Sequence, residues 1–202
     1  MLQETLYTVI IGYLFGSILT AIILSKILKF PDPRKHGSNN PGTSNVVRTA
    51  GIENGIYVLL GDIAKGAIAV ILVKFFIANQ SVAVMMGLAC IAAVIGHLYP
   101  VWFKFKGGKG VATFIGCLLA CNIWVGLLSM VLWGVILAVF RIASIASLIA
   151  VIAGLVLFIS HVIRGGAEMS GAVFPLLVAA AIVIWAHREN IKKLRAGNEK
   201  KV

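Results

Sequence analysis

A glycine-rich turn that carries three lysines is the part of this sequence best suited to binding an anion. The turn lies in GHLYPVWFKFKGGKGVAT, residues 96–113, between two apolar runs. Backbone N–H groups in such a turn can converge on a small anion, and a helix that begins just after it adds its positive end. The spacing also fits a basic loop at a membrane surface, so it favours phosphate binding without excluding that simpler interpretation. The candidate residues are Lys104, Lys106, Gly107, Gly108, Lys109 and Gly110.

Two further polar stretches have the residue types of a binding site. Residues 37–48 read GSNNPGTSNVVR, within a proline- and glycine-rich segment that predicts turns at 29–55. Their spacing is close to that of a nucleotide-binding P-loop, but Thr43 stands where that motif requires lysine, so we exclude nucleotide binding. Near the end of the chain, His187 and Asn190 lie three residues apart, on one face of a predicted helix. Taken alone, that segment is typical of a basic helix at a membrane surface.

The composition is that of an integral membrane protein. Of 202 residues, 60% are hydrophobic and only 12% are charged, and the mean hydropathy is +1.00. A soluble domain of this length cannot bury so much apolar surface. The net charge of +11 is expected to set the orientation in the membrane, which makes it weak support for nucleic-acid binding. The cysteines Cys90, Cys117 and Cys121 lie in apolar runs and are expected to pack there.

The apolar runs predict about seven membrane-spanning helices, two of them short, in a single domain over residues 1–202. The run at 111–140 is too long for one crossing, because such a helix would measure about 45 Å against a hydrocarbon core of about 30 Å. Two short helices that turn near Asn122 leave only Lys74 and Arg164 on the outer side, in agreement with the positive-inside rule. The predicted class is therefore all-α and polytopic, with the N-terminus outside and the C-terminus in the cytoplasm. The predicted spans are 6–28, 56–77, 82–103, two within 111–140, 142–163 and 171–186.

This topology gathers the polar motifs at the cytoplasmic face. Ser144 and Ser147 fall at the same face, where they fit equally a helix cap and donors to a substrate phosphate. Asp62 and Lys65 lie in the second predicted span, at a spacing that lets them pair on one helix face. The pair fits an ion pair that anchors the cytoplasmic end of this helix as well as it fits a functional site. His97 is interpreted as a hydrogen-bond donor in helix packing.

The polar motifs resemble those of the bacterial membrane acyl-phosphate:glycerol-3-phosphate acyltransferases. Residues 37–48, 96–113 and 187–200 match that family as they stand, and GDIAKG (61–66) and RIASIAS (141–147) match more loosely. The resemblance covers nearly the whole chain, in order. It implies transfer of an acyl group from a fatty acyl phosphate to the 1-hydroxyl of sn-glycerol 3-phosphate, which gives lysophosphatidic acid. It also implies a seven-span protein of the bacterial cytoplasmic (inner) membrane, in agreement with the topology.

The resemblance implies roles for individual residues. Ser38 and Arg48 take the positions of an essential serine and arginine, and the glycines of the turn take those that bind glycerol phosphate. His187 and Asn190 take positions that support activity, and Glu199 takes that of a structural glutamate. Three further positions match the family and are expected to contact substrate: Asn40, Gly42 and Asn45.

Some residues depart from the family pattern or leave the mechanism open. Leu19 and Ile142 stand where a proline and a tyrosine are usual, which affects fine positioning. The proton of the attacking hydroxyl passes either to His187 or to an oxygen of the acyl phosphate. We favour the second route, because no carboxylate in the sequence is obviously placed to hold the imidazole as a base.

The predicted chemistry mainly requires that two anions be positioned, since an acyl phosphate already carries a good leaving group. No cofactor and no metal are expected, and the predicted partners are the two substrates and the lipid bilayer, with the protein as a monomer. No histidine begins the H-x-x-x-x-D motif of soluble acyltransferases, and no Ser/His/Asp set for a covalent intermediate stands out. The alternative is a transporter for a phosphorylated metabolite, which would use the same basic turn.

Overall fold

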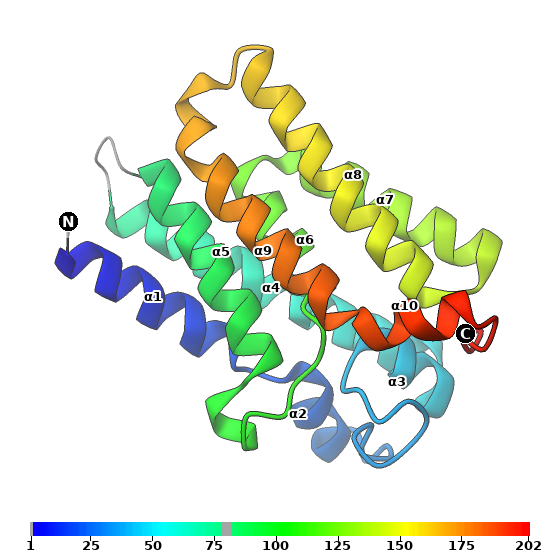
Figure 1. Ribbon diagram of the computed structural model, residues 1–202. Coiled ribbons are helices and arrows are strands. Elements are labelled where there is room, and N and C mark those ends of the chain that lie inside the picture. The colour runs from blue at the N-terminus through cyan, green and yellow to red at the C-terminus, as the bar shows by residue number, and fades with distance from the viewer. Residues whose placement is uncertain (1, 78–81) are drawn as a thin grey trace.

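The described part of the chain consists of helices joined by loops. The computed structural model describes residues 2–77 and 82–202, which contain α-helices, short 3-10 helices (η) and loops but no strand. The longer helices lie side by side as a slanted bundle (Figure 1). The elements are α1 (Leu2–Gly16), α2 (Thr20–Ile27), α3 (Thr43–Ala50), α4 (Ile52–Phe76), α5 (Val82–Leu98), η1 (Val101–Phe103), α6 (Val111–Cys121), α7 (Ile123–Phe140), α8 (Ala143–Ile163), η2 (Ala167–Ala172), α9 (Val173–Ala186) and α10 (Arg188–Arg195).

Six helical segments among the described residues are long and apolar enough to cross a membrane. They are Leu2–Ile27, Ile52–Phe76, Val82–Phe103, Ile123–Phe140, Ala143–Ile163 and Ala167–Ala186, and α6 is a shorter apolar helix. The predicted class of all-α, multi-pass membrane protein is therefore confirmed. Position 79, which the predicted topology places outside the cell, lies outside the described residues.

Helix α5 lies at the centre of the bundle. It packs against α1, α4 and α9, and most of its residues are buried, among them Met86, Cys90 and Val94. Gly12 and Gly16 of α1 lie directly against the backbone of α5, as their small-xxx-small spacing predicts. Because α5 ends at the loop that carries the lysine-rich turn, its firm packing gives that turn a rigid base.

The first predicted span is two helices rather than one. The predicted span at 6–28 corresponds to the apolar segment Leu2–Ile27, but the chain breaks at residues 17–19, between α1 and α2. The break frees the Ile18 carbonyl, which accepts a hydrogen bond from the buried Lys65 ammonium of α4 at 2.6 Å. Leu19 lies at this break, at the position where the resemblance implies a proline. A long-range hydrogen bond thus stabilises a break that the local sequence does not predict.

Helix α3 lies within the polar segment 29–55, which the sequence predicts to be turns. It covers residues 43–50, and Gly51 separates it from α4, which begins at Ile52 instead of residue 56. Val46 of α3 and Val58 of α4 belong to one small buried cluster. This apolar contact holds α3 on α4, at the same end of the bundle as α10 (Figure 1).

The turn predicted near Asn122 is confirmed. Helix α6 ends at Cys121 and α7 begins at Ile123. Asn122 caps α7, since its side-chain oxygen accepts the Val125 N–H at 3.0 Å. Of the two helices predicted to be short, α6 is short, with 11 residues, whereas α7 has 18 and is long enough to span.

One end of the bundle collects the polar motifs. Helices α2, α3 and α10 lie at this end together with the start of α8, while the N-terminus of α1 lies at the opposite end (Figure 1). Segments that are far apart in the sequence, around residues 40, 110, 145 and 190, therefore meet in one place.

Candidate active site

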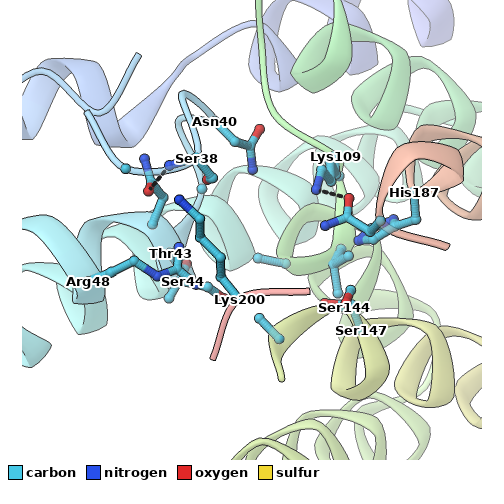
Figure 2. Close-up of a pocket in the computed structure, with 18 of the residues that line it drawn as sticks. Ser38, Asn40, Thr43, Ser44, Arg48, Lys109, Ser144, Ser147, His187 and Lys200 are labelled. Atoms are coloured by element: carbon cyan, nitrogen blue, oxygen red, sulfur yellow. Dashed lines mark hydrogen bonds between the residues drawn. The ribbon is translucent and has the colours of Figure 1, made fainter. Parts of the chain in front are cut away.

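A cavity of about 550 Å³ lies at this end of the bundle. The loop before α3, the first turns of α3, α6 and α8, and the chain around α10 supply most of its lining. Figure 2 shows two groups of side chains on opposite sides, one around Ser38 and Arg48 and one around Lys109 and His187, with Lys200 between them. The residues predicted from the sequence that line the cavity are Ser38, Asn40, Gly42, Asn45, Arg48, Lys109, Gly110, Ser144, His187 and Asn190.

Asn45 holds the polar loop in shape. Its side-chain oxygen accepts the Ser38 N–H at 2.8 Å, and its side-chain nitrogen donates to the carbonyls of Pro33 (2.9 Å) and His36 (3.0 Å). The residue is only 2% exposed. Because both halves of the amide are engaged with the backbone, the geometry supports an indirect role for Asn45, which is to fix the position of Ser38.

The first turn of α3 forms part of the cavity wall. Gly42, Thr43 and Ser44 all line the cavity, and the first N–H groups of a helix have no partners within the helix itself. The positive end of the helix dipole therefore faces the cavity. Arg48, one turn further along, donates from Nε and Nη2 to the Lys201 carbonyl, each at 3.3 Å. This wall offers backbone N–H groups, hydroxyls and a guanidinium to an anion.

Four polar side chains on the opposite wall form a hydrogen-bonded chain. The Lys109 ammonium donates to the side-chain oxygen of Asn190, whose nitrogen donates to the Glu199 carboxylate at 2.6 Å. The same carboxylate oxygen accepts the Ser144 hydroxyl at 3.0 Å. Ser144 therefore does not cap α8, whose N-cap residue is Ile142, and the capping interpretation is wrong. An ammonium has three N–H donors, so its bond to Asn190 leaves donors for a ligand.

The environment of Lys109 makes its charge sensitive to pH. Burial lowers the pKa of Lys109 to about 8, from an ordinary value of 10.5. The Glu199 carboxylate opposes this change, while the positive charges of Lys193 and Arg48 add to it. Lys109 is therefore mainly charged at neutral pH and loses its charge in mildly alkaline solution.

His187 connects α9 to α10 and is 3% exposed. Its Nδ1–H donates to the Val183 carbonyl at 2.8 Å, since a carbonyl can only accept. In the neutral ring Nε2 is then a hydrogen-bond acceptor. Burial, with a further contribution from the Lys109 charge, lowers the pKa of His187 to about 4. The imidazole is thus neutral at physiological pH and only weakly basic.

Four of the predicted phosphate-binding residues do not line the cavity: Lys104, Lys106, Gly107 and Gly108. The two lysines are exposed on the loop before the turn. The N–H groups of the two glycines donate to the carbonyls of Leu98 and His97, each at 3.0 Å. They bind the end of α5, so the turn does not form the predicted cradle of converging N–H groups. Within this motif, only Lys109 and Gly110 reach the cavity.

Other lining residues were missed by the sequence reasoning or assigned to packing. The sequence predicts no role for Thr43 and Ser44, and it predicts helix packing for His97. Asp62 had a usable signal, since a carboxylate inside a span is costly unless it is paired or functional. We find no sequence signal for the placement of Trp133. The lining residues for which the sequence predicts no role in a site are Gly37, Asn39, Thr43, Ser44, Leu59, Val111, Ala112, Ile115, Trp133, Ala143, Lys193, Asn198 and Lys200.

The charges around the cavity favour anionic ligands. Its cationic lining residues are Arg48, Lys109, Lys193 and Lys200. Both carboxylates in the lining are engaged, because Asp62 pairs with Lys65 at 2.9 Å and Glu199 accepts the hydrogen bonds given above. Within residues 2–77 and 82–202, no group of three or more His, Cys, Asp and Glu side chains could hold a metal ion.

Fold and cavity together define the class of protein: a multi-pass helical membrane protein with a cavity lined by basic residues at one end. The family model described as glycerol-3-phosphate acyltransferase matches residues 6–197. Relatives of that name include one from Coxiella burnetii, 43% identical over 195 residues, with 96% of each chain covered. Another, from Burkholderia thailandensis, is 40% identical over 200 residues, which cover 99% of this chain and 96% of the relative. The chain belongs to the glycerol-3-phosphate acyltransferase family.

Solved structures agree with this assignment. Crystal structures of PlsY, described as an integral membrane glycerol 3-phosphate acyltransferase, exist in a glycerol 3-phosphate form and a lysophosphatidic acid form. The first superposes with a TM-score of 0.86 at 36% identity, over 98% of this chain and 95% of PlsY. The second has a TM-score of 0.83 at 35% identity, over 98% and 94%.

Proposed function

We propose that this protein transfers a fatty acyl group from an acyl phosphate to the 1-hydroxyl of sn-glycerol 3-phosphate. Its products are lysophosphatidic acid and inorganic phosphate. Membership of the family and the two ligand forms of PlsY support the acceptor and the lipid product. One observation carries the choice of donor: two groups of cationic and polar side chains face each other across one cavity. Such a site suits a reaction in which both substrates carry a phosphate.

Each wall suits one of the two phosphates. Lys109 and Asn190, on one side, are proposed to hold glycerol 3-phosphate, in keeping with the role expected for the lysine-rich turn. Ser38, Arg48 and the first turn of α3, on the other side, are proposed to hold the acyl phosphate. The apolar part of the lining, formed by Leu59, Ile115 and Trp133, offers the acyl chain a path toward the lipid. We also propose that the enzyme is a monomer with a single domain.

The reaction needs little from the protein beyond position and charge. The glycerol 1-oxygen attacks the acyl carbonyl carbon, a new carbon–oxygen bond forms, and the bond from carbon to the phosphate oxygen breaks. The hydroxyl proton passes to an oxygen of the departing phosphate, so no protein base is consumed. His187 Nε2 accepts a hydrogen bond from a glycerol hydroxyl and thereby orients it. Cations on both walls stabilise the negative charge that develops on the carbonyl and phosphate oxygens.

An assay with purified protein tests this function. Detergent-solubilised protein, given a long-chain acyl phosphate and labelled glycerol 3-phosphate, is expected to form labelled lysophosphatidic acid. Detergent micelles have no compartments, so a transporter would leave the glycerol phosphate unchanged. None of the comparisons supports the transporter alternative. Protein that binds labelled glycerol 3-phosphate but forms no lipid product from either acyl phosphate or other acyl donors would contradict the proposal.

We also propose a seven-crossing topology in the bacterial cytoplasmic membrane, with the cavity facing the cytoplasm. In this arrangement α6 counts as a short seventh crossing. The cavity end of the bundle carries most of the basic residues. Lys74 and Arg164 lie at the C-terminal ends of α4 and α8, away from the cavity. This distribution supports a cytoplasmic cavity and C-terminus and an outer N-terminus.

Single cysteines in a cysteine-free background test the topology. After replacement of Cys90, Cys117 and Cys121 with serine, Thr43→Cys and Asn198→Cys are expected to react with an impermeant thiol reagent only from the cytoplasmic side. Glu168→Cys, in the exposed segment after α8, is expected to react only from outside. Reaction of position 198 from outside in intact cells would rule out the seven-crossing arrangement.

A further inference from the structure

A buried polar cluster lies beneath the cavity and takes no part in the reaction as described so far. Asp62 and Lys65 of α4 and His97 of α5 are each only 2–3% exposed. The Lys65 ammonium lies 2.9 Å from the Asp62 carboxylate and 2.7 Å from His97 Nδ1. Thr20 of α2 donates its hydroxyl to the same carboxylate at 3.0 Å. Asp62 and His97, but not Lys65, also line the cavity.

The hydrogen bonds of Lys65 define the state of the His97 ring. An ammonium carries three N–H donors and no acceptor. Lys65 has three partners at bonding distance: the Ile18 carbonyl, the Asp62 carboxylate and His97 Nδ1. Because the ammonium can only donate, each of these three groups must accept a hydrogen bond from it, including His97 Nδ1. His97 is therefore neutral, and its proton is on Nε2.

The Nε2 side of His97 faces the lysine-rich turn. If Gly108 carried a Cβ atom, its nearest neighbours would be Nε2 and the adjacent carbons of the His97 ring, too close to be accommodated without a shift. The Gly108 N–H also donates to the His97 backbone carbonyl at 3.0 Å. Immediately before Lys109, the turn is thus hydrogen-bonded to the His97 backbone and lies directly against the His97 ring.

We propose that Asp62, Lys65 and His97 form a positioning unit for the phosphate-binding lysine. The Asp62 carboxylate holds Lys65, Lys65 holds the His97 ring in one orientation, and the ring sets the course of the turn at Gly108. Lys109 then reaches the cavity and meets Asn190. The unit acts on glycerol 3-phosphate binding through Lys109, and this role rests on the proposed function.

Two variants interrupt the unit at different points without leaving a buried charge unpaired. Asp62→Leu with Lys65→Met removes both charges together, and replacement of a buried ion pair by apolar side chains of similar volume is often neutral or stabilising. His97→Asn keeps an acceptor near the position of Nδ1 for Lys65 but removes the ring beside Gly108. For both we expect an unfolding midpoint close to that of the unmodified protein. We expect KM for glycerol 3-phosphate to rise about tenfold, with kcat changed less than about threefold.

Gly108→Ala tests the same link from the other side. Its Cβ must displace the His97 ring, so we expect it also to raise the KM for glycerol 3-phosphate more than it lowers kcat. Combined with His97→Asn, it should add little, because both changes disturb one contact. Thr8→Val is the matched control, since it alters a fully buried polar residue of α1 that does not line the cavity and should leave KM unchanged.

A second measurement does not depend on turnover. The rate at which Lys109 reacts with acetic anhydride, followed by peptide mass spectrometry across pH, reports its apparent pKa and exposure. In both unit variants that pKa is expected to rise from about 8 toward 10.5, because the turn no longer buries the ammonium. Folded variants with unchanged KM and unchanged Lys109 reactivity would overturn the positioning role. Absence of lysophosphatidic acid formation by the unmodified protein would overturn the proposed function instead, and the Lys109 reactivity would still decide the positioning role.

Discussion

Replacing Lys109 with methionine is expected to lower kcat/KM for acyl transfer by about 10³. Methionine keeps the length and most of the volume of the side chain but removes the charge that faces the cavity. Loss of one partner from a desolvated, hydrogen-bonded charge pair costs about 2–5 kcal/mol, and a 10³-fold loss corresponds to about 4 kcal/mol. Most of the loss is expected in KM for glycerol 3-phosphate, since the phosphate is bound in the ground state as well.

The pH profile provides an independent test of the same residue. Only the charged form of Lys109 can hold a phosphate, and its pKa of about 8 lies below the ordinary 10.5. The charge is present below pH 8 and is lost as the pH rises through that value, so kcat/KM is expected to fall in alkaline solution. Lys109→Arg stays charged at every accessible pH and should remove that alkaline limb, even with lower activity overall.

Two results would contradict the role of Lys109. One is a methionine variant whose kcat/KM falls less than about tenfold. The other is an alkaline limb near pH 8 that persists unchanged in the arginine variant. Lys104→Met and Lys106→Met are the matched controls, because these lysines lie on the same loop, are exposed and do not line the cavity. Each is expected to change kcat/KM by less than about threefold, which also tests the earlier prediction that they bind phosphate.

Replacing His187 with glutamine is expected to raise KM for glycerol 3-phosphate about tenfold and to leave substantial kcat. Glutamine can still take part in hydrogen bonds but cannot accept a proton. The pKa of His187 is lowered to about 4, so the neutral imidazole is a poor proton acceptor at pH 7 but remains a good hydrogen-bond acceptor through Nε2. An orienting role therefore fits the geometry better than general-base catalysis, which typically contributes about 10²–10⁴-fold to the rate.

Steady-state kinetics across pH separate these two roles. Since His187 is neutral throughout the range from about pH 5 to pH 9, we expect no limb of the profile near pH 6.5 that depends on this residue. A fall in kcat of about 10³ or more at unchanged KM, together with loss of such a limb, would show that His187 is the base. His161→Gln is the control, because His161 lies near the far end of α8 and does not line the cavity.

To a large extent, the sequence alone determined the class of protein and which residues line the cavity. Hydropathy depends on local composition, so the apolar runs identified the long helices. Membrane thickness and the distribution of basic residues predicted the turn near Asn122, which the structure confirms. The same topology brought Ser38, Lys109, Ser144 and His187 to one end of the bundle, where they line a single cavity. Each of these conclusions needs only local patterns and one physical constraint, the bilayer.

Tertiary contacts decided which residues of a motif reach the cavity. Lys104, Lys106 and Lys109 have equivalent chemistry in the sequence, but only Lys109 lines the cavity. The difference arises because the glycine N–H groups bind the end of α5, which turns the chain inward just before Lys109. Ser144 likewise donates to Glu199 instead of capping its helix, and that partner lies in a different part of the chain.

The break at residues 17–19 and the state of His97 depend on one buried ammonium that no local pattern places. Lys65 binds a carbonyl of the first span, a carboxylate of its own helix and an imidazole of α5. The sequence predicts only the second contact, because Asp62 and Lys65 lie one helical turn apart. The other two require three helices to pack together first. Buried polar groups must find hydrogen-bond partners wherever packing brings them, so only the tertiary structure could assign them.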